Sequence, residues 1–243
     1  MRVRTCHSRW FSAFLFLFVF VLSFQGVAAP IDRPPEDRWV ERFRAAGLAG
    51  DTEWIPMRDG TRLAATIAKP LFGDEFPTIL IRTPYGRDEL EIGGVLLPLS
   101  GYAVVMQDMR GRGDSEGQDR VFVDDGWGQN RDGYDTVEWI AAQSWSNGKI
   151  GTWGPSALGI VQGLMAGANP PHLTCQVISY AASKGYGQAA YQGGVFRESL
   201  VHGWLSGQDS MHMLPLFKAH PTDDEFWDHY DIESRHPVMT APA

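Results

Sequence analysis

The sequence predicts an α/β fold whose mostly parallel sheet is covered by helices. Short apolar strands alternate with helical patterns between residues 78 and 181, an order typical of parallel sheets with helices on both faces. Polar or glycine-rich loops follow three of these strands, at Tyr85, at Asp108 to Asp114 and at Ser156. Because ligands bind beyond the carboxyl ends of such strands, we expect these three segments to meet at one rim of the sheet.

The first part of the predicted sheet lies before residue 110. Two strands flank the pair Asp59-Gly60, which is typical of a β-hairpin turn. The apolar runs Thr78–Arg82 and Tyr102–Gln107 have the length of buried strands, and each runs into a loop that contains glycine.

Two helices and two more strands follow. Residues 131–145 carry apolar side chains at helical spacing, so they predict an amphipathic helix. Residues 147–156 predict a strand and a turn, and residues 157–171 predict an apolar helix that ends at Asn169 and two prolines. The last strand is expected over residues 173–181, with Cys175 as a small, partly apolar side chain within it.

From Ser183 onward the composition changes. The segment is rich in glycine, histidine and aromatic residues, with helical patterns at 196–205 and 223–230. It fits a helical insertion better than another strand–helix unit. Its tryptophans and tyrosines either line an apolar pocket or pack against one another.

The N-terminus has the pattern of a secretory signal peptide. A basic start is followed by an apolar run from Phe11 to Phe24 and by small residues that end at Ala28. The apolar run is shorter than the roughly 20 residues of a membrane span. We therefore expect cleavage near Ala28 and a secreted or periplasmic protein that meets the membrane only during export. Anchoring by residues 11–24 is the alternative.

The charge of the chain argues against a nucleic-acid partner. The formal net charge is −8, and loss of residues 1–28, which contain three arginines and no acid, makes it −11. Such a surface repels nucleic acid and anionic lipid.

The charged loop from Asp108 to Asp114 contains no phosphate-loop motif, and we expect it to brace neighbouring loops through ion pairs.

The segment GTWGPSALG, residues 151–159, has the features of a turn that presents a nucleophile. A strand leads into Ser156, a helix starts directly after it, and Gly154 and Gly159 leave room for a tight bend. The helix N-terminus and the Ala157 N–H would face a developing oxyanion. The spacing is G-x-S-x-x-G, one residue longer than the common pattern, so a structural turn serine stays open from this segment alone.

Five sequence blocks in order carry a resemblance to a known family: residues 57–70, 79–87, 101–117, 132–159 and 170–173. Together they resemble the X-Pro dipeptidyl-peptidase-like serine hydrolases, which include cocaine esterase-like, glutaryl-acylase-like and α-amino acid ester hydrolase enzymes. The resemblance implies an α/β-hydrolase fold with a helical cap, and in that family the turn reads G-x-S-x-x-G. It implies Ser156 as nucleophile, with the hydroxyl of Tyr85 and the N–H of Ala157 as oxyanion donors. No cofactor or metal is implied.

The resemblance also implies an aspartate and a histidine that complete a triad after the cap. No segment beyond Ser156 has the expected strand ending in aspartate, and residues 232–243 resemble only the approach to it. We therefore interpret the chain as the N-terminal portion of such an enzyme, with the last strands and a C-terminal β-sandwich missing and with impaired hydrolysis. The expected domain boundaries are a signal peptide at residues 1–28, a leader or linker at 29–50, the α/β-hydrolase core at 51–182 and a truncated cap at 183–243.

The expected substrate is a small ester or amide, or a short peptide, and the oligomeric state is not predicted. The resemblance implies that α-amino acid ester hydrolases hold a substrate ammonium group with acids early in the cap. Residues 185–194 contain no acid, which favours substrates without a free amine. Two alternatives remain: a non-catalytic fragment, and a binding module anchored in the membrane. Five histidines follow residue 200, and we considered a metal site there. Their spacings fit no zinc pattern.

Overall fold

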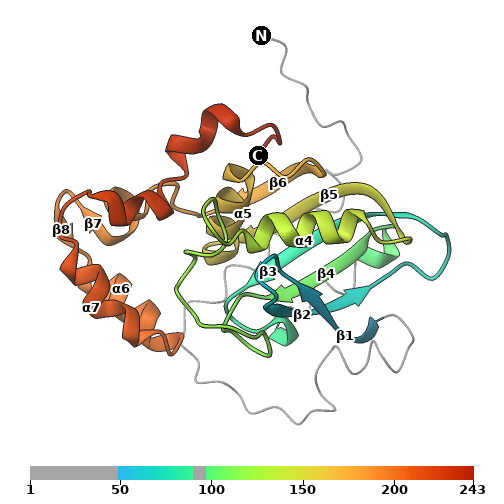
Figure 1. Cartoon of the computed structure of the whole chain (residues 1–243), viewed down its shortest axis with the longest axis horizontal. Coiled ribbons are helices and arrows are strands. Elements are labelled where there is room, and N and C mark those ends of the chain that lie inside the picture. Colours follow the sequence, from blue (N-terminus) through green and yellow to red (C-terminus); the bar gives the residue numbers. More distant parts are fainter. Residues whose placement is uncertain (1–48, 90–96) are drawn as a thin grey trace. The chain divides into compact units, whose positions relative to one another are not determined.

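The computed structural model describes residues 49–89 and 97–243, so the predicted signal peptide and most of the leader lie outside the described residues. The central sheet has the strand order β1-β2-β4-β3-β5-β6 (Figure 1). The strands are β1 (Ala49–Pro56), β2 (Arg62–Ala68), β3 (Phe76–Thr83), β4 (Ala103–Asp108), β5 (Ser146–Pro155) and β6 (Leu173–Ser179). Strands β3 to β6 pair in parallel, whereas β1 and β2 pair antiparallel, which confirms the predicted mostly parallel sheet.

The predicted hairpin joins β1 to β2. Trp54 pairs with Ala64 across the hairpin, and the Gly60 N–H donates to the Met57 carbonyl at 2.9 Å. Gly60 has φ +85°, a conformation that glycine adopts without steric cost. The Asp59-Gly60 pair therefore forms the turn that its composition predicts.

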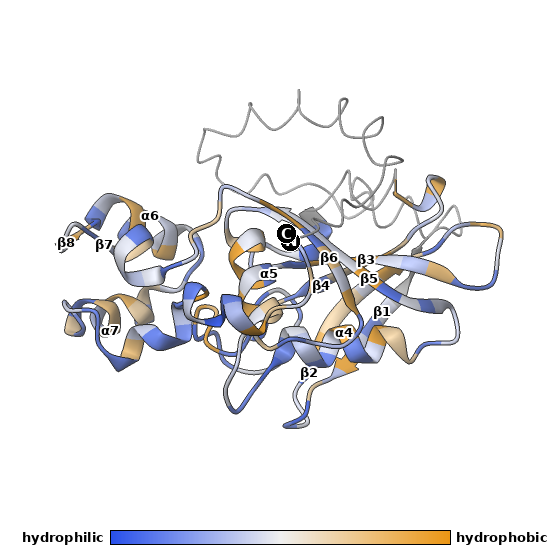
Figure 2. Cartoon of the chain, turned by 90° about the horizontal axis from the view of Figure 1, so that it is seen from above, coloured by the Kyte–Doolittle hydropathy of each residue, from blue (hydrophilic) through white to orange (hydrophobic). Residues whose placement is uncertain are grey.

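Two helices pack on the sheet and on each other, α4 (Asp132–Ala141) and α5 (Ala157–Gly167). Val137 and Ile140 of α4 share a buried core with Leu80, Val105 and Met165. Nearly every residue of α5 is buried, and Figure 2 shows apolar colours along this helix and the strands beside it. The apolar composition of residues 157–167 thus reflects burial of the whole helix rather than of one face.

The sheet is covered on both faces. Successive side chains of a strand point to opposite faces, and every residue of β4 is buried, as are seven of the eight in β3. Ile79 and Ile81 are as inaccessible as Leu80 between them. This burial explains why these strands read as continuous apolar runs.

The segment after β6 is mainly helical, as predicted. Its elements are η4 (Gly185–Ala190), β7 (Tyr191–Gln192), β8 (Val195–Phe196), α6 (Glu198–Gly207), η5 (Met211–Met213), α7 (Leu214–Ala219), η6 (Glu225–Tyr230) and η7 (Glu233–Val238). The helix expected from residue 196 begins only at Glu198, because Val195 and Phe196 pair with β7. Helix α7 was not predicted; its second residue is a proline, which the first turn of a helix accepts.

This helical segment has an apolar core of its own. Tyr191, Leu205, Phe217 and Trp227 are buried together, and Tyr186 stacks on Tyr191 with ring centroids 5.2 Å apart. The aromatic residues therefore follow both predicted alternatives, since some pack here and others line the cavity described below.

The outer edge of β6 contacts the last residues of the chain. The Gln176 N–H donates to the Pro242 carbonyl at 2.9 Å, and Met239 and Ala241 pack against the core of the sheet. An edge strand exposes unpaired N–H and C=O groups, and this hydrogen bond gives the Gln176 N–H a partner. None of the helices in residues 49–89 and 97–243 has the length and apolarity that crossing a membrane requires.

Arg110, in the loop after β4, clamps the hairpin turn to the start of α4. Its guanidinium donates to Asp59 at 2.7 Å, to Thr61 at 2.7 Å and to Asp132 at 2.7 Å. The hydrogen bond from Arg110 lowers the pKa of Asp59 from 3.8 to about 2. The loop from Asp108 to Asp114 therefore has the bracing function that we predicted for it.

Replacing Asp59 by asparagine should destabilise the fold in a pH-dependent way. Since the pKa is lower in the folded state, the stabilisation is present above about pH 4 and is lost as the pH falls towards 2. Because Asp59 is partly exposed, we expect a loss of about 1 kcal/mol, or about 2–4 °C in Tm, at pH 7. Thermal unfolding of Asp59→Asn between pH 7 and pH 2 measures this, with the exposed Asp74→Asn as the charge-matched control. A Tm difference that grows on acidification would contradict the assignment.

Candidate active site

Ser156 occupies a strained turn between β5 and α5. Its backbone angles are φ 55° and ψ −124°, in the left-handed half of conformational space that non-glycine residues rarely enter. Its N–H donates to the Ser179 carbonyl at 2.9 Å, and its own carbonyl accepts from the Gly159 and Ile160 N–H groups at 2.9 Å. The turn is therefore held from both sides, by the neighbouring strand β6 and by the first turn of α5.

Gly154 and Gly159 allow this turn to be tight. A Cβ atom on Gly154, whose φ is +152°, would lie 2.5 Å from the Cβ of Leu158. A Cβ atom on Gly159 would lie 2.7 Å from the Cβ of Ala181. Both distances are below van der Waals contact, so α5 can approach β5 and β6 this closely only with glycine at these positions.

The turn presents the Ser156 side chain and the N–H of Ala157 together. Ser156 is exposed, whereas Ala157 is 2% exposed and is the first residue of α5. The first N–H groups of a helix have no acceptor within that helix, and within the described chain the Ala157 N–H has no other acceptor. The Ser156 hydroxyl likewise makes no hydrogen bond with any residue of 49–89 or 97–243.

Tyr85 lies in the loop after β3, the strand next to β5. Its N–H donates to the Thr83 hydroxyl at 3.0 Å, and its hydroxyl accepts a hydrogen bond from Trp204 Nε1 at 3.1 Å. The two rings meet edge to face with centroids 6.5 Å apart. Trp204 belongs to α6, so this contact joins the rim of the sheet to the helical segment.

Arg112 makes a second connection between the same two regions. Its Nε donates to the Pro84 carbonyl at 3.0 Å, and its Nη1 donates to the Gln208 carbonyl at the end of α6. Gln208 is four residues beyond Trp204. The loop that carries Tyr85 and the helix that carries Trp204 are thus held by one guanidinium.

Asp108, at the end of β4, holds the remaining loop in place. Its buried carboxylate accepts from the Arg87 N–H at 2.6 Å and the Asp114 N–H at 3.1 Å, and it pairs with the Arg87 guanidinium. A Cβ atom on Gly113 would lie 2.3 Å from Asp108 Oδ2. The ends of β3, β4 and β5 therefore meet at one rim, as the sequence predicted.

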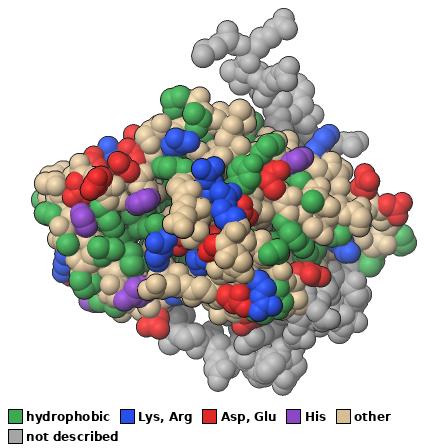
Figure 3. All heavy atoms as spheres, in the orientation of Figure 1, with side chains coloured by type: hydrophobic (Ala, Val, Ile, Leu, Met, Phe, Trp, Pro, Cys, Tyr) green, Lys and Arg blue, Asp and Glu red, His purple; other side chains and the backbone are tan. Residues whose placement is uncertain are grey.

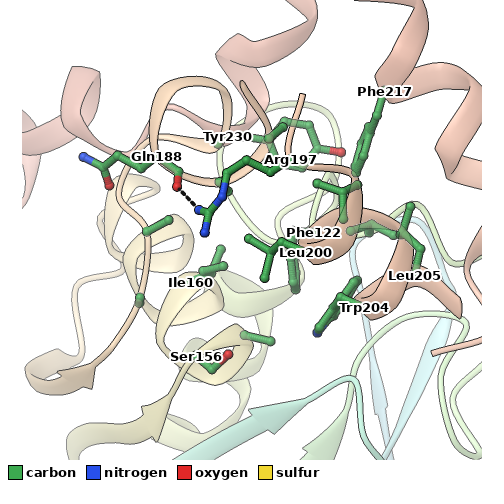
Figure 4. A pocket seen from close by; sticks show the side chains of 18 of the residues that line it. Phe122, Ser156, Ile160, Gln188, Arg197, Leu200, Trp204, Leu205, Phe217 and Tyr230 are labelled. Atoms are coloured by element: carbon green, nitrogen blue, oxygen red, sulfur yellow. Dashed lines mark hydrogen bonds between the residues drawn. The ribbon is translucent and has the colours of Figure 1, made fainter. Parts of the chain in front are cut away.

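A cavity of about 420 Å³ opens beside Ser156 (Figure 4). One wall comes from the sheet side, with Ser156, Ala157 and Ile160, and the other comes mainly from α6, with Arg197, Leu200 and Trp204. The volume suits a small organic molecule. The remaining described lining residues are Val121, Phe122, Tyr180, Ala181, Ala182, Gly185, Gln188, Ala189, Ala190, Val201, Leu205, Phe217, Trp227 and Tyr230.

Two lining residues are unusual. Phe122 has φ 67° and tilts against Trp204 with ring centroids 5.5 Å apart, so a second strained backbone segment supports the cavity wall. The Tyr230 hydroxyl is buried without a hydrogen-bond partner, and burial raises the pKa of Tyr230 above its usual value. The phenol is therefore neutral at physiological pH.

The histidines are dispersed. His172 pairs with Glu138 at 2.8 Å, His220 pairs with Asp224 at 3.0 Å, and His212 bonds to the Asp119 carbonyl at 2.8 Å. In the described part of the chain no three His, Cys, Asp or Glu side chains lie close enough to hold a metal ion. Figure 3 shows the histidines of one face separated from one another.

Sequence reasoning did not single out Trp204, Phe122, Ile160 or Arg197. Arg197 directly precedes α6, and Trp204 follows it by seven residues, a spacing that matches helical periodicity. That spacing could have placed them on one face, but it could not show that this face meets Ser156.

The sheet order, the left-handed turn after β5 and the helix that follows it define an α/β-hydrolase fold. Residues 59–236 match the X-Pro dipeptidyl-peptidase (S15) family, and the chain belongs to that family.

Three relatives illustrate the similarity. The cocaine esterase of Rhodococcus sp. (strain MB1 Bresler) is 34% identical over 157 residues, which are 62% of this chain and 27% of that enzyme. A CocE/NonD family hydrolase from Staphylococcus aureus has a TM-score of 0.68 at 26% identity, over 75% of this chain and 38% of the other. An aminopeptidase from a marine sediment archaeon, Thaumarchaeota archaeon, has a TM-score of 0.65 at 22% identity, over 89% and 44% of the two chains. The chain therefore spans about a quarter to less than half of the length of these relatives.

Gly154→Ala should disrupt the turn, whereas Gly203→Ala in α6 should not. The first substitution adds a Cβ atom 2.5 Å from Leu158 at a φ of +152° and should cost about 3 kcal/mol. The second meets no atom within 4 Å in a helix, where alanine is favoured by about 1 kcal/mol. Urea unfolding of both variants compares the two positions. Equal midpoints would show that the turn tolerates a side chain at residue 154.

Proposed function

We propose that this chain carries the nucleophile and oxyanion donors of a serine hydrolase that cleaves an ester or amide through an acyl-enzyme on Ser156. The observation that carries the proposal is the left-handed turn, which aims an exposed hydroxyl outward at the start of α5. α/β-hydrolases carry their nucleophile in such a turn. Family membership supports the same conclusion, since the family is that of X-Pro dipeptidyl-peptidases.

In the proposed reaction, Ser156 Oγ attacks the carbonyl carbon and the carbonyl oxygen becomes an oxyanion. The Ala157 N–H, free of other acceptors in the described chain, donates to that oxygen at the positive end of α5. The alcohol or amine then leaves with the proton that Ser156 Oγ gave up. Water next attacks the acyl-enzyme, its hydroxyl goes to the acid product and its proton restores the Ser156 hydroxyl.

The Tyr85 hydroxyl is the proposed second donor. An indole N–H can only donate, so the hydrogen bond from Trp204 uses an acceptor site of Tyr85 and leaves the Tyr85 proton available. Accepting a hydrogen bond also polarises the hydroxyl and makes it a better donor. Trp204 is therefore a positioning residue that keeps the Tyr85 proton directed towards the oxyanion.

Within the described residues, no base contacts the proposed nucleophile. The Ser156 hydroxyl has no histidine partner in residues 49–89 and 97–243, and an unassisted serine is a weak nucleophile near neutral pH. We expect the 243-residue chain to turn over slowly and to retain only the residual catalysis that oxyanion donors and binding provide.

The proposed substrates are small esters or amides, since the cavity holds about 420 Å³ and its walls are largely apolar. The similarity to a named cocaine esterase supports an ester, and the family description supports a short peptide.

We also propose export by the N-terminal signal. A non-catalytic binding module is the second candidate, favoured by the free Ser156 hydroxyl, and a reactive-serine probe separates the two.

A biotinylated fluorophosphonate should modify Ser156 slowly and up to one equivalent per chain, because the oxyanion donors give residual reactivity even without a base that activates the hydroxyl. Intact mass and peptide mapping after overnight reaction at pH 8 measure the adduct. Ser156→Ala should abolish it, while Ser206→Ala, at an exposed serine of α6, should not. An adduct that survives Ser156→Ala would exclude Ser156 as the modified residue, and no adduct in the unchanged chain would contradict the residual reactivity that the oxyanion donors are proposed to provide.

Tyr85→Phe should slow acylation of Ser156 by 4-nitrophenyl acetate about a hundredfold, the typical cost of one oxyanion donor. Trp204→Phe should slow it about tenfold, because the hydroxyl of Tyr85 loses its orienting partner. The double variant should be no slower than Tyr85→Phe alone, since Trp204 acts through Tyr85. The absorbance of released 4-nitrophenol, followed over hours and corrected with Ser156→Ala, measures the rates. Independent, multiplying effects would contradict the positioning role.

A further inference from the structure

Gln162 is the polar side chain of helix α5. The helix otherwise contains only apolar residues and glycine, and Gln162 is 3% exposed. An apolar side chain of the same length would fill this space without the cost of removing an amide from water. What distinguishes Gln162 from such a side chain is its set of hydrogen bonds, and these lie at the turn that carries Ser156.

The Gln162 amide joins the two sides of that turn. Its Nε2 donates to the Gly154 carbonyl, two residues before Ser156, and to the Leu158 carbonyl, two residues after it, each at 3.0 Å. An amide nitrogen carries two protons, so both are used, one on each side of Ser156. The two hydrogen bonds bracket residues 155–157, which contain the proposed nucleophile and the peptide N–H that is proposed to bind the oxyanion.

A third hydrogen bond fixes the orientation of this amide. The Gln162 Oε1 accepts from the Thr152 hydroxyl at 2.7 Å, and Thr152 is also 3% exposed. The opposite orientation would place Oε1 against two carbonyl oxygens, which cannot donate. Because Thr152 and Gly154 both belong to β5, that strand holds the amide and also accepts one of its protons.

The bracketed turn has an unusual backbone at two positions. Gly154 has φ +152° and Ser156 has φ 55°. Such conformations persist only where the surrounding contacts hold them in place. The Ser156 N–H is held by the Ser179 carbonyl, and Gln162 adds a hydrogen bond to the carbonyl of Gly154. The amide therefore holds the part of the turn that precedes the serine.

We propose that Gln162 is a positioning residue, which fixes the angle between β5 and α5 and thereby the direction of Ser156 Oγ and of the Ala157 N–H. This inference rests on the proposed function and names a further residue of the same site. Gln162 is not among the described residues that line the cavity, so it acts through the turn and not on the substrate. A small displacement of an attacking oxygen slows a reaction strongly, because the attack requires close and aligned atoms.

Two substitutions separate hydrogen bonding from packing. Gln162→Met keeps the length of the side chain but removes both donated protons. Gln162→Glu keeps its shape, and the new carboxyl can donate a proton only while it is protonated. Burial raises the pKa of a carboxyl, so this variant should lose its donor as the pH rises through that raised pKa.

The matched control is Gln176→Met on the neighbouring strand β6. Gln176 is also a buried glutamine, at 6% exposure, and its Nε2 donates at 2.7 Å to a backbone carbonyl of α5, that of Gln162. This hydrogen bond lies outside residues 154–158. The control therefore removes a comparable buried hydrogen bond without releasing the turn.

Fluorophosphonate labelling of Ser156 at 10 °C, between pH 5 and pH 10, measures the effect once near-UV circular dichroism has shown that each variant is folded. We expect Gln162→Met to label about tenfold more slowly than the unchanged chain at every pH. Gln162→Glu should come within about threefold of the unchanged chain at low pH and should be about tenfold slower once its carboxyl ionises, because a carboxylate cannot donate. Gln176→Met should stay within about twofold, because it does not displace the turn.

The exchange of the Ser156 N–H with deuterium reports on the turn without any reaction. Measured by NMR, this exchange should be about tenfold faster in Gln162→Met than in the unchanged chain, and Gln176→Met should change it little. Equal labelling rates for Gln162→Met and Gln176→Met, or an exchange rate that Gln162→Met leaves unchanged, would overturn the inference. If Gln162→Met does not fold, Gln162→Glu decides the question, and a labelling rate that follows the unchanged chain at every pH then overturns it.

The result is separate from that of the proposed function. Faster exchange of the Ser156 N–H in a chain that forms no adduct supports the role of Gln162 in the turn and rejects the hydrolase. An adduct that forms at the same rate in every variant supports the hydrolase and rejects the role of Gln162.

Discussion

The left-handed conformation of Ser156 is the constraint on which the rest of the structure depends. It turns the chain from the end of β5 directly into α5 and leaves the hydroxyl outside both elements. Such a conformation is costly for a residue with a side chain, and here it is maintained by hydrogen bonds to Ser179 on one side and from the first turn of α5 on the other. The small residues around it follow from this geometry, because a tight bend between a strand and a helix leaves no room for side chains at residues 154 and 159.

A second layer of contacts fixes the loops around that turn. Arg87, Arg110 and Arg112 all lie in loops at the rim, and each donates to more than one segment. Loops at strand ends are otherwise the least constrained parts of an α/β fold. Because the guanidinium of Arg112 reaches both the Pro84 carbonyl and the end of α6, the helical segment is bound to the sheet at the point where the cavity opens.

Much of this could be predicted from the sequence. Strand runs such as Thr78–Arg82 are apolar throughout because the sheet is covered on both faces, and the Asp59-Gly60 turn and the join at Ser156 are marked by glycines at fixed positions. The cavity could not be predicted in the same way. The position of Trp204 or Arg197 opposite Ser156 depends on how α6 packs, and no local pattern encodes a contact between residues so far apart. Likewise, the hydrogen bond between Gln176 and Pro242 joins an edge strand to a segment without strand periodicity.

Trp204 both forms a wall of the cavity and donates its indole proton to Tyr85. A substitution of Trp204 therefore changes the shape of the cavity and also removes the hydrogen-bond donor to the Tyr85 hydroxyl at the rim. Leu200, one turn earlier on the same helix, lines the cavity and makes no polar contact through its side chain. If Ser156 and Tyr85 act as proposed, a substitution at Leu200 changes the cavity alone, whereas a substitution at Trp204 changes the cavity and the proposed oxyanion donor together.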